Sequence, residues 1–342
     1  MKVLIDIGHP AHVNFFKNAL DQLQRDGWEI KLTVLNRGKL PLIASDVFKD
    51  YNVQVINRHR GKKWSIIIEA NIFKFFTLLR VCLKFKPDIG LSAGSFVLGA
   101  VLKILDKPNL QFDDDPERKA NVFLEKITST KLYFPMFFKR TLGKISRYNA
   151  LKEWAYLSPN RYNPDINALN HYDLTFREYI FVREVSVGSL NYSNQKSNLI
   201  ASVSNRFPVN VKVILSLEDK SSINQYPSEW VLLQEPVKDI HALIFYSKLL
   251  ISSGDSMARE AAVMGVPSIY CGIRKMSANQ ELINKKMLFH KDIQDVPPLI
   301  EDILNKKVKI PEQEHFISQL KNEWIDVADF IVNEVLSYSK GK

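Results

Sequence analysis

The chain has 342 residues, of which 46% are hydrophobic and 25% charged, which is the composition of an ordinary globular protein. This length predicts about two domains, each large enough to bury its own core. The formal net charge of +10 indicates an anionic partner, which leaves nucleic acid, an anionic membrane and phosphorylated substrates as the classes to consider.

The first residues and the cysteines bear on the compartment. The chain opens on a strand-like run from Val3 to Ile7 in place of a secretory signal, so we expect a cytoplasmic protein. Cys82 and Cys271 are too few for a disulfide framework and have no metal-ligand spacing, which predicts two buried hydrophobic residues. We expect neither a bound metal nor a cofactor.

Short apolar runs alternate with helical patterns through the first 112 residues. Strands are predicted at residues 3–7, 28–35, 53–57, 89–92 and 109–112, with helices ending near Arg25, starting near Pro41, covering residues 65–84 and ending near Asp106. This alternation predicts a doubly wound parallel sheet, in which ligands bind at the carboxyl ends of the strands.

Three turns of the predicted sheet lie at that edge. Their candidate ligand contacts are Gly8, His9, His12, Gly94, Ser95, Asp113 and Asp114. A neutral imidazole is the usual general base near pH 7, which makes His12 a candidate, although helix capping and packing would also explain both histidines. The acidic run from Asp113 to Glu117 fits a metal site, a general base or the first turn of a helix.

The segment from Arg58 to Lys86 is strongly basic and also rich in aromatic and aliphatic residues. It holds eight Lys or Arg residues and one acid, Glu69. Charges interrupt it too often for a membrane span. It fits an amphipathic helix on an anionic membrane surface, with the protein then peripheral on the inner face of the cell membrane. It equally fits a core helix whose solvated face is basic.

Turn residues concentrate at 148–164, which predicts the crossing between domains. A second α/β set follows. Its strands are predicted at residues 179–183, 211–217, 231–234, 249–251 and 268–270, and its helices at 204–210, 238–246, 255–264, 279–286, 298–305 and 311–339. The polar loop 187–193 is a candidate ligand cover.

The turn between strand 249–251 and helix 255–264 is the second candidate site. Its residues are Ser253, Gly254, Asp255, Ser256 and Met257. Backbone N–H groups at a helix N-terminus carry partial positive charge, so this turn could receive a diphosphate, with Glu260 one helical turn further on to bind a ribose diol. The alternative is that Ser253 and Asp255 only cap the helix and Glu260 faces water.

The order of these elements resembles the GT-B architecture of nucleotide-sugar glycosyltransferases. Residues 254–267 are similar to the donor motif of the N-acetylglucosaminyltransferase that makes lipid II, which implies that Glu260 binds the uridine ribose and that Gln280 contacts the donor sugar. Under this resemblance the fold is α/β. Two doubly wound Rossmann-like domains, at residues 1–160 for the acceptor and 161–342 for the donor, would face each other across a cleft. It leaves open whether the last helix packs back on the N-terminal domain.

A resemblance over nearly the whole chain is to a GT-B-like prokaryotic family of unknown function. It is carried by segments 10–17, 94–95, 152–157, 182–183 and 256–262. The UDP-N-acetylglucosamine 2-epimerases share this fold, but they carry an Asp where this chain has Ser95, and a Glu where the nearest match is Asp113.

These resemblances imply a glycosyltransferase that uses a nucleotide sugar and needs no metal. That the nucleotide is UDP is inferred from the family. Surface polysaccharide or glycolipid synthesis on a polyprenyl-linked acceptor would be its setting. Arg183 is a further candidate contact to the donor, and His12, Asp113 or Asp114 the candidate base. An epimerase is the alternative, and a non-catalytic binder of membrane or nucleic acid a third. The chain carries no nucleic-acid-binding motif, so we expect no nucleic-acid partner.

Overall fold

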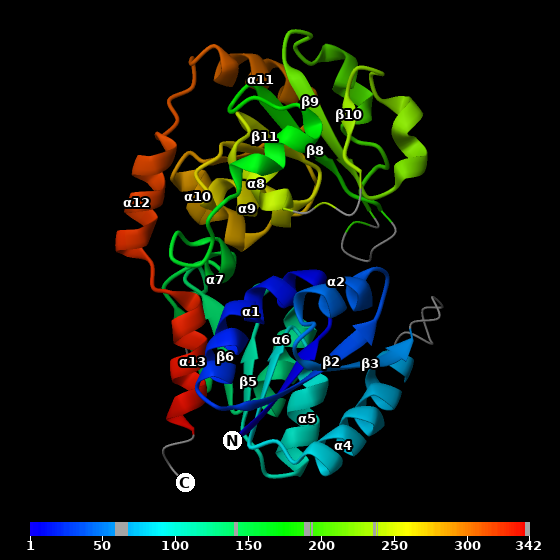
Figure 1. The fold of residues 1–342 in the computed structure, drawn as a ribbon, viewed down its shortest axis with the longest axis vertical. Helices are drawn as coiled ribbons and strands as arrows, with labels where there is room; N and C mark the ends of the chain where they lie inside the picture. The colour runs from blue at the N-terminus through cyan, green and yellow to red at the C-terminus, as the bar shows by residue number, and fades with distance from the viewer. Residues whose placement is uncertain are drawn as a thin grey trace. The chain divides into compact units, whose positions relative to one another are not determined.

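The computed structural model describes residues 1–58, 68–139, 143–187, 192, 194–234, 237 and 239–338. The chain forms two compact units (Figure 1). Unit 1 comprises Met1–Tyr156 and Trp324–Lys342, and unit 2 comprises Leu157–Glu323. The chain therefore leaves unit 1, completes unit 2 and returns to unit 1.

Unit 1 contains a seven-stranded parallel sheet in the order β3-β2-β1-β4-β5-β6-β7. Its strands are β1 (Lys2–Ile7), β2 (Glu29–Asn36), β3 (Asn52–Arg58), β4 (Ile89–Ala93), β5 (Asn109–Phe112), β6 (Lys131–Pro135) and β7 (Ile145–Tyr148). All seven strands are parallel, but successive strands are added toward one edge of the sheet up to β3 and toward the other edge from β4 onward, so the switch point lies between β1 and β4. This switch point opens a crevice at the carboxyl ends of these two strands.

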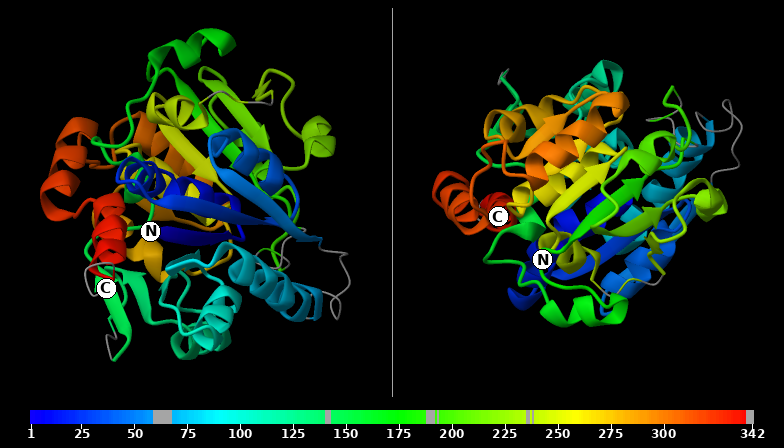
Figure 2. Two further views of the ribbon diagram at one scale, coloured as in Figure 1. Left: turned by 60° about the horizontal axis from the view of Figure 1, so that its bottom comes forward. Right: turned by 90° about the horizontal axis from the view of Figure 1, so that it is seen from above.

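Helices cover both faces of the unit 1 sheet (Figures 1 and 2). They are α1 (Pro10–Arg25), α2 (Leu40–Val47), η1 (Ile68–Phe73), α4 (Lys74–Phe85), α5 (Phe96–Ile104), α6 (Lys119–Thr128), α7 (Trp154–Leu157), whose last residue lies in unit 2, and α13 (Val327–Ser337). Because strand side chains alternate, Leu4 faces α4 and α5, whereas Phe112 and Tyr133 contact Phe16 of α1 and Phe330 of α13.

Unit 2 contains a six-stranded parallel sheet in the order β10-β9-β8-β11-β12-β13. Its strands are β8 (Tyr179–Glu184), β9 (Lys212–Leu217), β10 (Val231–Leu232), β11 (Leu249–Ser252), β12 (Ser268–Tyr270) and β13 (Leu288–His290). The switch point here lies between β8 and β11. Apolar residues of β8, β9, β11 and α11 (Val296–Leu304) form a buried core on one face of this sheet.

The other helices of unit 2 are short apart from one. They are η2 (Ile166–Tyr172), η3 (Ala201–Arg206), η4 (Lys220–Gln225), α8 (Ile240–Phe245), α9 (Asp255–Val263), η5 (Ser277–Asn279), α10 (Gln280–Asn284), η6 (Ile293–Asp295) and α12 (Gln313–Glu323). The doubly wound parallel sheet predicted for each half of the chain is confirmed.

Several local predictions were wrong or incomplete. The single helix at 311–339 is two helices, α12 and α13, because Trp324, which lies between them in the sequence, is buried against Trp154, and the Asp326 carboxylate caps α13 by accepting from the Asp329 N–H at 3.1 Å. The predicted crossing at 148–164 begins inside unit 1, since β7 ends at Tyr148. Strands β7 and β13 and helix α6 were not predicted. The segment predicted as helix 204–210 is the 3-10 helix η3, Ala201–Arg206.

Two predictions fall partly on residues that lie outside the described ones. Residues 59–67 of the basic segment are outside, and the part that follows is a π-helical turn, η1, leading into α4. Residues 188–191 and 193 of the polar loop 187–193 are also outside. Both cysteines are buried free thiols, as predicted.

Candidate functional site

Each sheet has a polar cluster at the carboxyl ends of the two strands that flank its switch point. In unit 1 these are the turns after β1 and β4, joined by the turn after the neighbouring β5. In unit 2 the turn between β11 and α9 lies beside the end of β8. In open α/β sheets this is the position at which ligands bind.

The turn before α9 is fixed by its own serine hydroxyls. The Ser252 Oγ accepts from the Gly254 N–H at 3.0 Å and donates to the Gly254 carbonyl oxygen at 2.7 Å. The Ser253 Oγ accepts from the Val185 N–H at 2.9 Å. A Cβ on Gly254 would lie 2.6 Å from the Val185 side chain, so the close approach of β8 requires glycine there. The predicted contact Ser253 therefore joins the turn to the end of β8.

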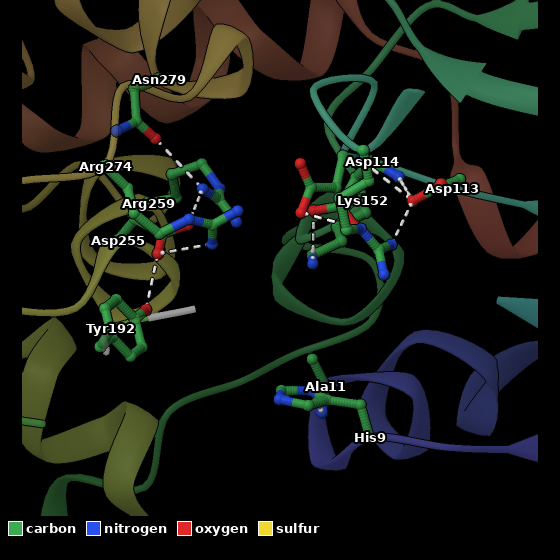
Figure 3. Close-up of polar contacts among 12 residues, drawn as sticks. His9, Ala11, Asp113, Asp114, Lys152, Tyr192, Asp255, Arg259, Arg274 and Asn279 are labelled. Carbon is green, nitrogen blue, oxygen red and sulfur yellow. Dashed lines mark hydrogen bonds and ion pairs between the residues drawn. The ribbon is translucent and has the colours of Figure 1, made fainter. Parts of the chain in front are cut away.

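Asp255 is the centre of a buried network. Its carboxylate accepts from the Tyr192 hydroxyl at 2.6 Å and from the Arg259 Nη1 at 2.8 Å, and Arg274 lies 3.5 Å away (Figure 3). Arg259 also donates to the Asn279 Oδ1 at 3.1 Å. Burial opposes the charge of Asp255, but Arg259, the Tyr192 hydroxyl and Arg274 outweigh it and lower the pKa of this carboxyl. Asp255 is thus held as an anion by protein groups.

No side chain caps the N-terminus of α9, because the N-cap is Gly254. Ser256 and Met257, in the first turn, are partly exposed, whereas Asp255 is buried. The surface that this turn presents is consequently formed by Ser256, Met257 and the first backbone N–H groups of the helix. Such a surface carries the partial positive charge that attracts phosphate.

Glu260 is paired with His241 of α8. The two side chains are 12% and 16% exposed, and their Oε2 and Nε2 atoms are 3.5 Å apart. Burial alone would lower the pKa of His241, but the Glu260 carboxylate raises it above its ordinary value. Glu260 therefore neither faces open water nor caps its helix, and it remains close enough to the surface to accept from a ligand.

The two other predicted donor contacts of unit 2 lie apart from this network. The Arg183 Nη1 donates to the Ser216 Oγ at 3.0 Å, and its Nη2 lies 3.8 Å from Glu218. The exposed Gln280 donates to the Asn284 Oδ1 at 2.8 Å. The neighbouring residue, Asn279, is the one that turns inward, toward Arg259.

In unit 1, the turn after β4 is anchored on a buried ion pair. Gly94 adopts a left-handed conformation with φ of 60°, which favours glycine. The Ser95 Oγ donates to the Asp6 Oδ2 at 3.2 Å, and the Lys74 Nζ lies 2.5 Å from the same carboxylate oxygen. Asp6 and Lys74 are both buried. The hydroxyl of Ser95 is thus engaged with the protein interior.

Asp113 organises the turn after β5. Its Oδ1 accepts from the backbone N–H groups of Asp114 and Asp115, at 2.7 and 3.0 Å, and from the Arg118 Nη2 at 3.2 Å. Asp114 points elsewhere, to the Lys152 Nζ at 2.5 Å (Figure 3). Asp114 is also the more exposed carboxylate, at 21% against 1% for Asp113. Of the two predicted acids, Asp114 is the one a substrate can reach.

His12 and His9 differ in their surroundings. The exposed His9 caps α1, because its Nδ1 accepts from the Ala11 N–H at 3.2 Å. The Nδ1 of His12 is buried and has no hydrogen-bond partner among the residues that the structure describes. Burial, followed by the charges of His9 and Lys152, lowers the pKa of His12 well below its ordinary value. His12 is therefore neutral at pH 7, as a general base must be.

A pocket in unit 1 brings together four of the seven predicted residues, His12, Gly94, Asp113 and Asp114, whereas Gly8, His9 and Ser95 do not line it. It is lined by His12, Phe15, Ala93, Gly94, Phe112, Asp113, Asp114, Arg118, Tyr148 and Lys152. The acidic run does not start the next helix, since α6 begins at Lys119 without an acidic residue in its first turn. Across the described ranges, no three His, Cys, Asp or Glu side chains are grouped as metal ligands.

Comparison with known proteins identifies the family of this chain and solved structures with a similar fold. A family model described as "Protein of unknown function (DUF354)" matches residues 1–340. The chain belongs to this family. An uncharacterised protein of Methanocaldococcus jannaschii is 20% identical over 364 residues, which cover 99% of each chain.

Two solved structures show the same fold as this DUF354 protein. The UDP-GlcNAc 2-epimerase of Methanocaldococcus jannaschii, in complex with UDP-GlcNAc and UDP, is 14% identical, with a TM-score of 0.72 over 99% of this chain and 100% of that one. A spinosyn rhamnosyltransferase complexed with spinosyn aglycone is 13% identical, with a TM-score of 0.70 over 98% and 100%. The fold is the GT-B architecture, with two Rossmann-like domains, as predicted.

Sequence reasoning missed several side chains of both clusters. In unit 1 it assigned no role to Arg118 or Lys152, and in unit 2 it overlooked Tyr192, His241 and Arg274. Arg259 carried a usable signal, because Asp255 and Arg259 are four residues apart on one helix and such pairs meet. The other contacts join distant parts of the chain, so no local pattern could reveal them.

Proposed function

We propose that this protein is a glycosyltransferase that takes its sugar from a nucleotide sugar bound by unit 2. The observation that carries the proposal is the turn before α9, which lies at the switch point of its sheet without a side-chain cap, with Glu260 one helical turn further along. The likeness in fold to an epimerase solved with UDP-GlcNAc supports UDP as the nucleotide.

Each part of the donor has a candidate partner in unit 2. The diphosphate would lie against the N–H groups of Ser256 and Met257, with Arg274, 19% exposed beside Asp255, as the nearby cation. The ribose hydroxyls would donate to Glu260, which the contact with His241 holds in place. Gln280 and Arg183 are further candidate contacts. Charge that develops on the leaving diphosphate would be met by the helix terminus, so the proposal requires no metal.

The acceptor would bind the pocket of unit 1, with Gly8, His9, Gly94 and Ser95 in the turns at its edge. The neutral His12 would remove the proton of the acceptor hydroxyl, and Asp114, held by Lys152, would stabilise the imidazolium that forms. Asp113 would act through the conformation of the turn.

The substitution Glu260→Ala tests the donor site. It should raise the dissociation constant for UDP or a UDP sugar at least tenfold, because a charged hydrogen-bond partner of a ligand contributes roughly 1.5–3 kcal/mol. Glu301→Ala, on the exposed surface of α11, is the matched control. An unchanged dissociation constant for the Glu260 variant, measured by calorimetry, would remove Glu260 from the site.

An epimerase that interconverts UDP-N-acetylhexosamines is the second candidate, because the DUF354 fold is also that of UDP-GlcNAc 2-epimerases. Such an enzyme needs carboxylates that remove and return a proton at the sugar. Incubation of the protein with UDP-N-acetylhexosamine in deuterated water, without acceptor, separates the two. Deuterium incorporation at the sugar ring would establish epimerisation, and sugar transfer only when an acceptor is added would establish the transferase.

The exposed face of α4 and η1 supports an acceptor that is lipid-linked. Ile72, Phe73, Phe76 and Leu83 are large exposed hydrophobic residues, and Arg80 and Lys84 are exposed beside them at helical spacing. Of the helices described, none is long and apolar enough to cross a bilayer. An apolar face with basic residues is the pattern of a helix that lies on an anionic membrane, as would suit polyprenyl-linked substrates in glycolipid or surface polysaccharide synthesis.

The membrane assignment is tested with vesicles that contain an anionic phospholipid. The protein should co-sediment with them at low salt and dissociate as salt rises, because salt screens the charges. Phe73→Glu with Phe76→Glu should abolish binding, whereas Leu42→Glu, at an exposed position of α2, should not. Equal sedimentation of both variants would exclude this face.

A further inference from the structure

Glu125 is a buried carboxyl group that the proposed chemistry leaves unused. It lies on α6 and is fully buried. Its Oε1 accepts from the Asn121 side-chain amide, which also donates to the backbone oxygen of Gly94 at 3.5 Å. Glu125 is thus connected to the turn after β4 through one residue, and its other oxygen must be accounted for.

The second oxygen of Glu125 shares one property with an oxygen of Asp113. The Glu125 Oε2 and the Asp113 Oδ2 are both buried, and neither has an N–H or O–H donor among the residues that the structure describes. Of the charged groups around Glu125, Asp113 acts most strongly on it. Two buried carboxylate ions would repel one another, whereas one proton between them would serve both unpartnered oxygens.

The surroundings decide which group carries the proton. Asp113 accepts from two backbone N–H groups and from the Arg118 guanidinium, so three donors already serve one of its oxygens. Glu125, among the described residues, accepts from the Asn121 amide alone. Burial first, then the charge and hydrogen bond of Asp113, raise the pKa of Glu125 far above its ordinary value, with Asp114 adding to the rise and Arg118 opposing it.

We propose that Glu125 is a neutral carboxylic acid that donates its proton to the Asp113 Oδ2 and so positions the turn of residues 113–115 at the pocket of unit 1. The proton lets Asp113 keep its negative charge, and that charge holds Arg118 and the backbone of Asp114 and Asp115. Glu125 is a positioning residue. The role of this turn in binding an acceptor rests on the proposed function, whereas the protonation of Glu125 does not.

The test compares Glu125→Gln with the wild type. Glutamine has the same shape, and its amide donates to Asp113 at every pH while its oxygen still accepts from Asn121. Because the pKa of Glu125 is raised in the folded wild-type protein, the free energy of unfolding falls as pH rises above the pKa of an unfolded glutamate, about 4.3. The unfolding equilibrium constant of the wild type, divided by that of Glu125→Gln, should therefore increase by up to tenfold for each unit of pH from about pH 5 to 8.

Two controls sharpen this comparison. Glu301→Gln, at an exposed glutamate of α11, should show no such dependence on pH. Glu125→Ala leaves the Asp113 Oδ2 buried without a donor, so it should be less stable than both Glu125→Gln and the wild type at pH 7. A stability difference between Glu125→Gln and wild type that does not vary with pH would overturn the proposal.

Infrared spectroscopy of the wild type gives an independent result. A protonated carboxyl band should persist at pH 7, where exposed carboxyl groups are ionised, and it should lose intensity in Glu125→Gln, with Glu184, whose pKa burial also raises, as the source of any remainder. Absence of the band from the wild type would contradict the proposal even if the variant fails to fold. Nucleotide binding by unit 2 is measured separately. A protein that binds no nucleotide but keeps the carboxyl band would therefore contradict the proposed function and leave the protonation of Glu125 supported.

Discussion

At the scale of single residues, the side chains that resemble ligands in the sequence often serve the protein itself. Asp255, Ser253 and Ser95 have small polar side chains at ligand-binding turns, yet each is engaged with neighbouring protein groups. A polar residue at a turn satisfies the chemistry of both a cap and a ligand contact. The sequence could locate the turns, but it could not show which way each side chain points.

His12 provides the first prediction at this scale. Its lowered pKa keeps it neutral at pH 7, and protonation at lower pH would remove the base. Transfer activity should therefore hold through pH 7 and fall only at a pH below the ordinary histidine range. His12→Asn should reduce kcat roughly 10²–10⁴-fold. Steady-state kinetics over pH provide the measurement, and a variant with unchanged kcat would exclude His12 as the base.

The ion pair of His241 and Glu260 provides the second prediction at the scale of single residues. The pKa of His241 is raised in the folded protein, so the pair stabilises the fold fully below the unfolded pKa of about 6.5 and loses this contribution as pH rises through the folded value. His241→Gln should therefore cost more stability at pH 6 than at pH 9. Urea unfolding at both pH values measures the difference, which should have the opposite sign if the imidazole is buried neutral.

At the scale of elements, prediction from sequence succeeded where the apolar period was long and failed where tertiary contacts end an element. The strands next to both switch points were predicted nearly to the residue. By contrast, residues 311–339 keep a helical pattern throughout, and they are divided by the burial of Trp324, by a hydrogen bond from the Ile325 N–H to the Asn149 oxygen and by the Asp326 cap of α13. Strand β13 has three residues, too few to show a period.

The start of α13 can be tested directly. Asp326→Ala removes the side chain that accepts from the Asp329 N–H, and loss of such an N-cap costs about 0.5–2 kcal/mol. The free energy of unfolding from denaturant titration should fall by that amount. Asp46→Ala, at an exposed position within α2, is the matched control and should change it by less than about 0.5 kcal/mol. Equal losses would show that Asp326 does not act as a cap.

At the scale of the whole molecule, each unit has its own sheet and core, so the two should respond separately to a ligand of one of them. Calorimetry should resolve two transitions, and UDP at about 100 times its dissociation constant should stabilise one of them by roughly 2.7 kcal/mol. The transition that moves should be the one lowered by destabilising substitutions in unit 2. A shift of both transitions by equal amounts would contradict independent units.

The path of the chain through the two units sets an order of folding during synthesis. Residues 157–323, the whole of unit 2, are made before α13, whose buried Val327, Ile331 and Val335 complete the core of unit 1. Unit 2 can therefore close its sheet while the earlier residues of unit 1 still expose the apolar surface that α13 will cover. On the ribosome, the part of the protein that begins first is the part that finishes last.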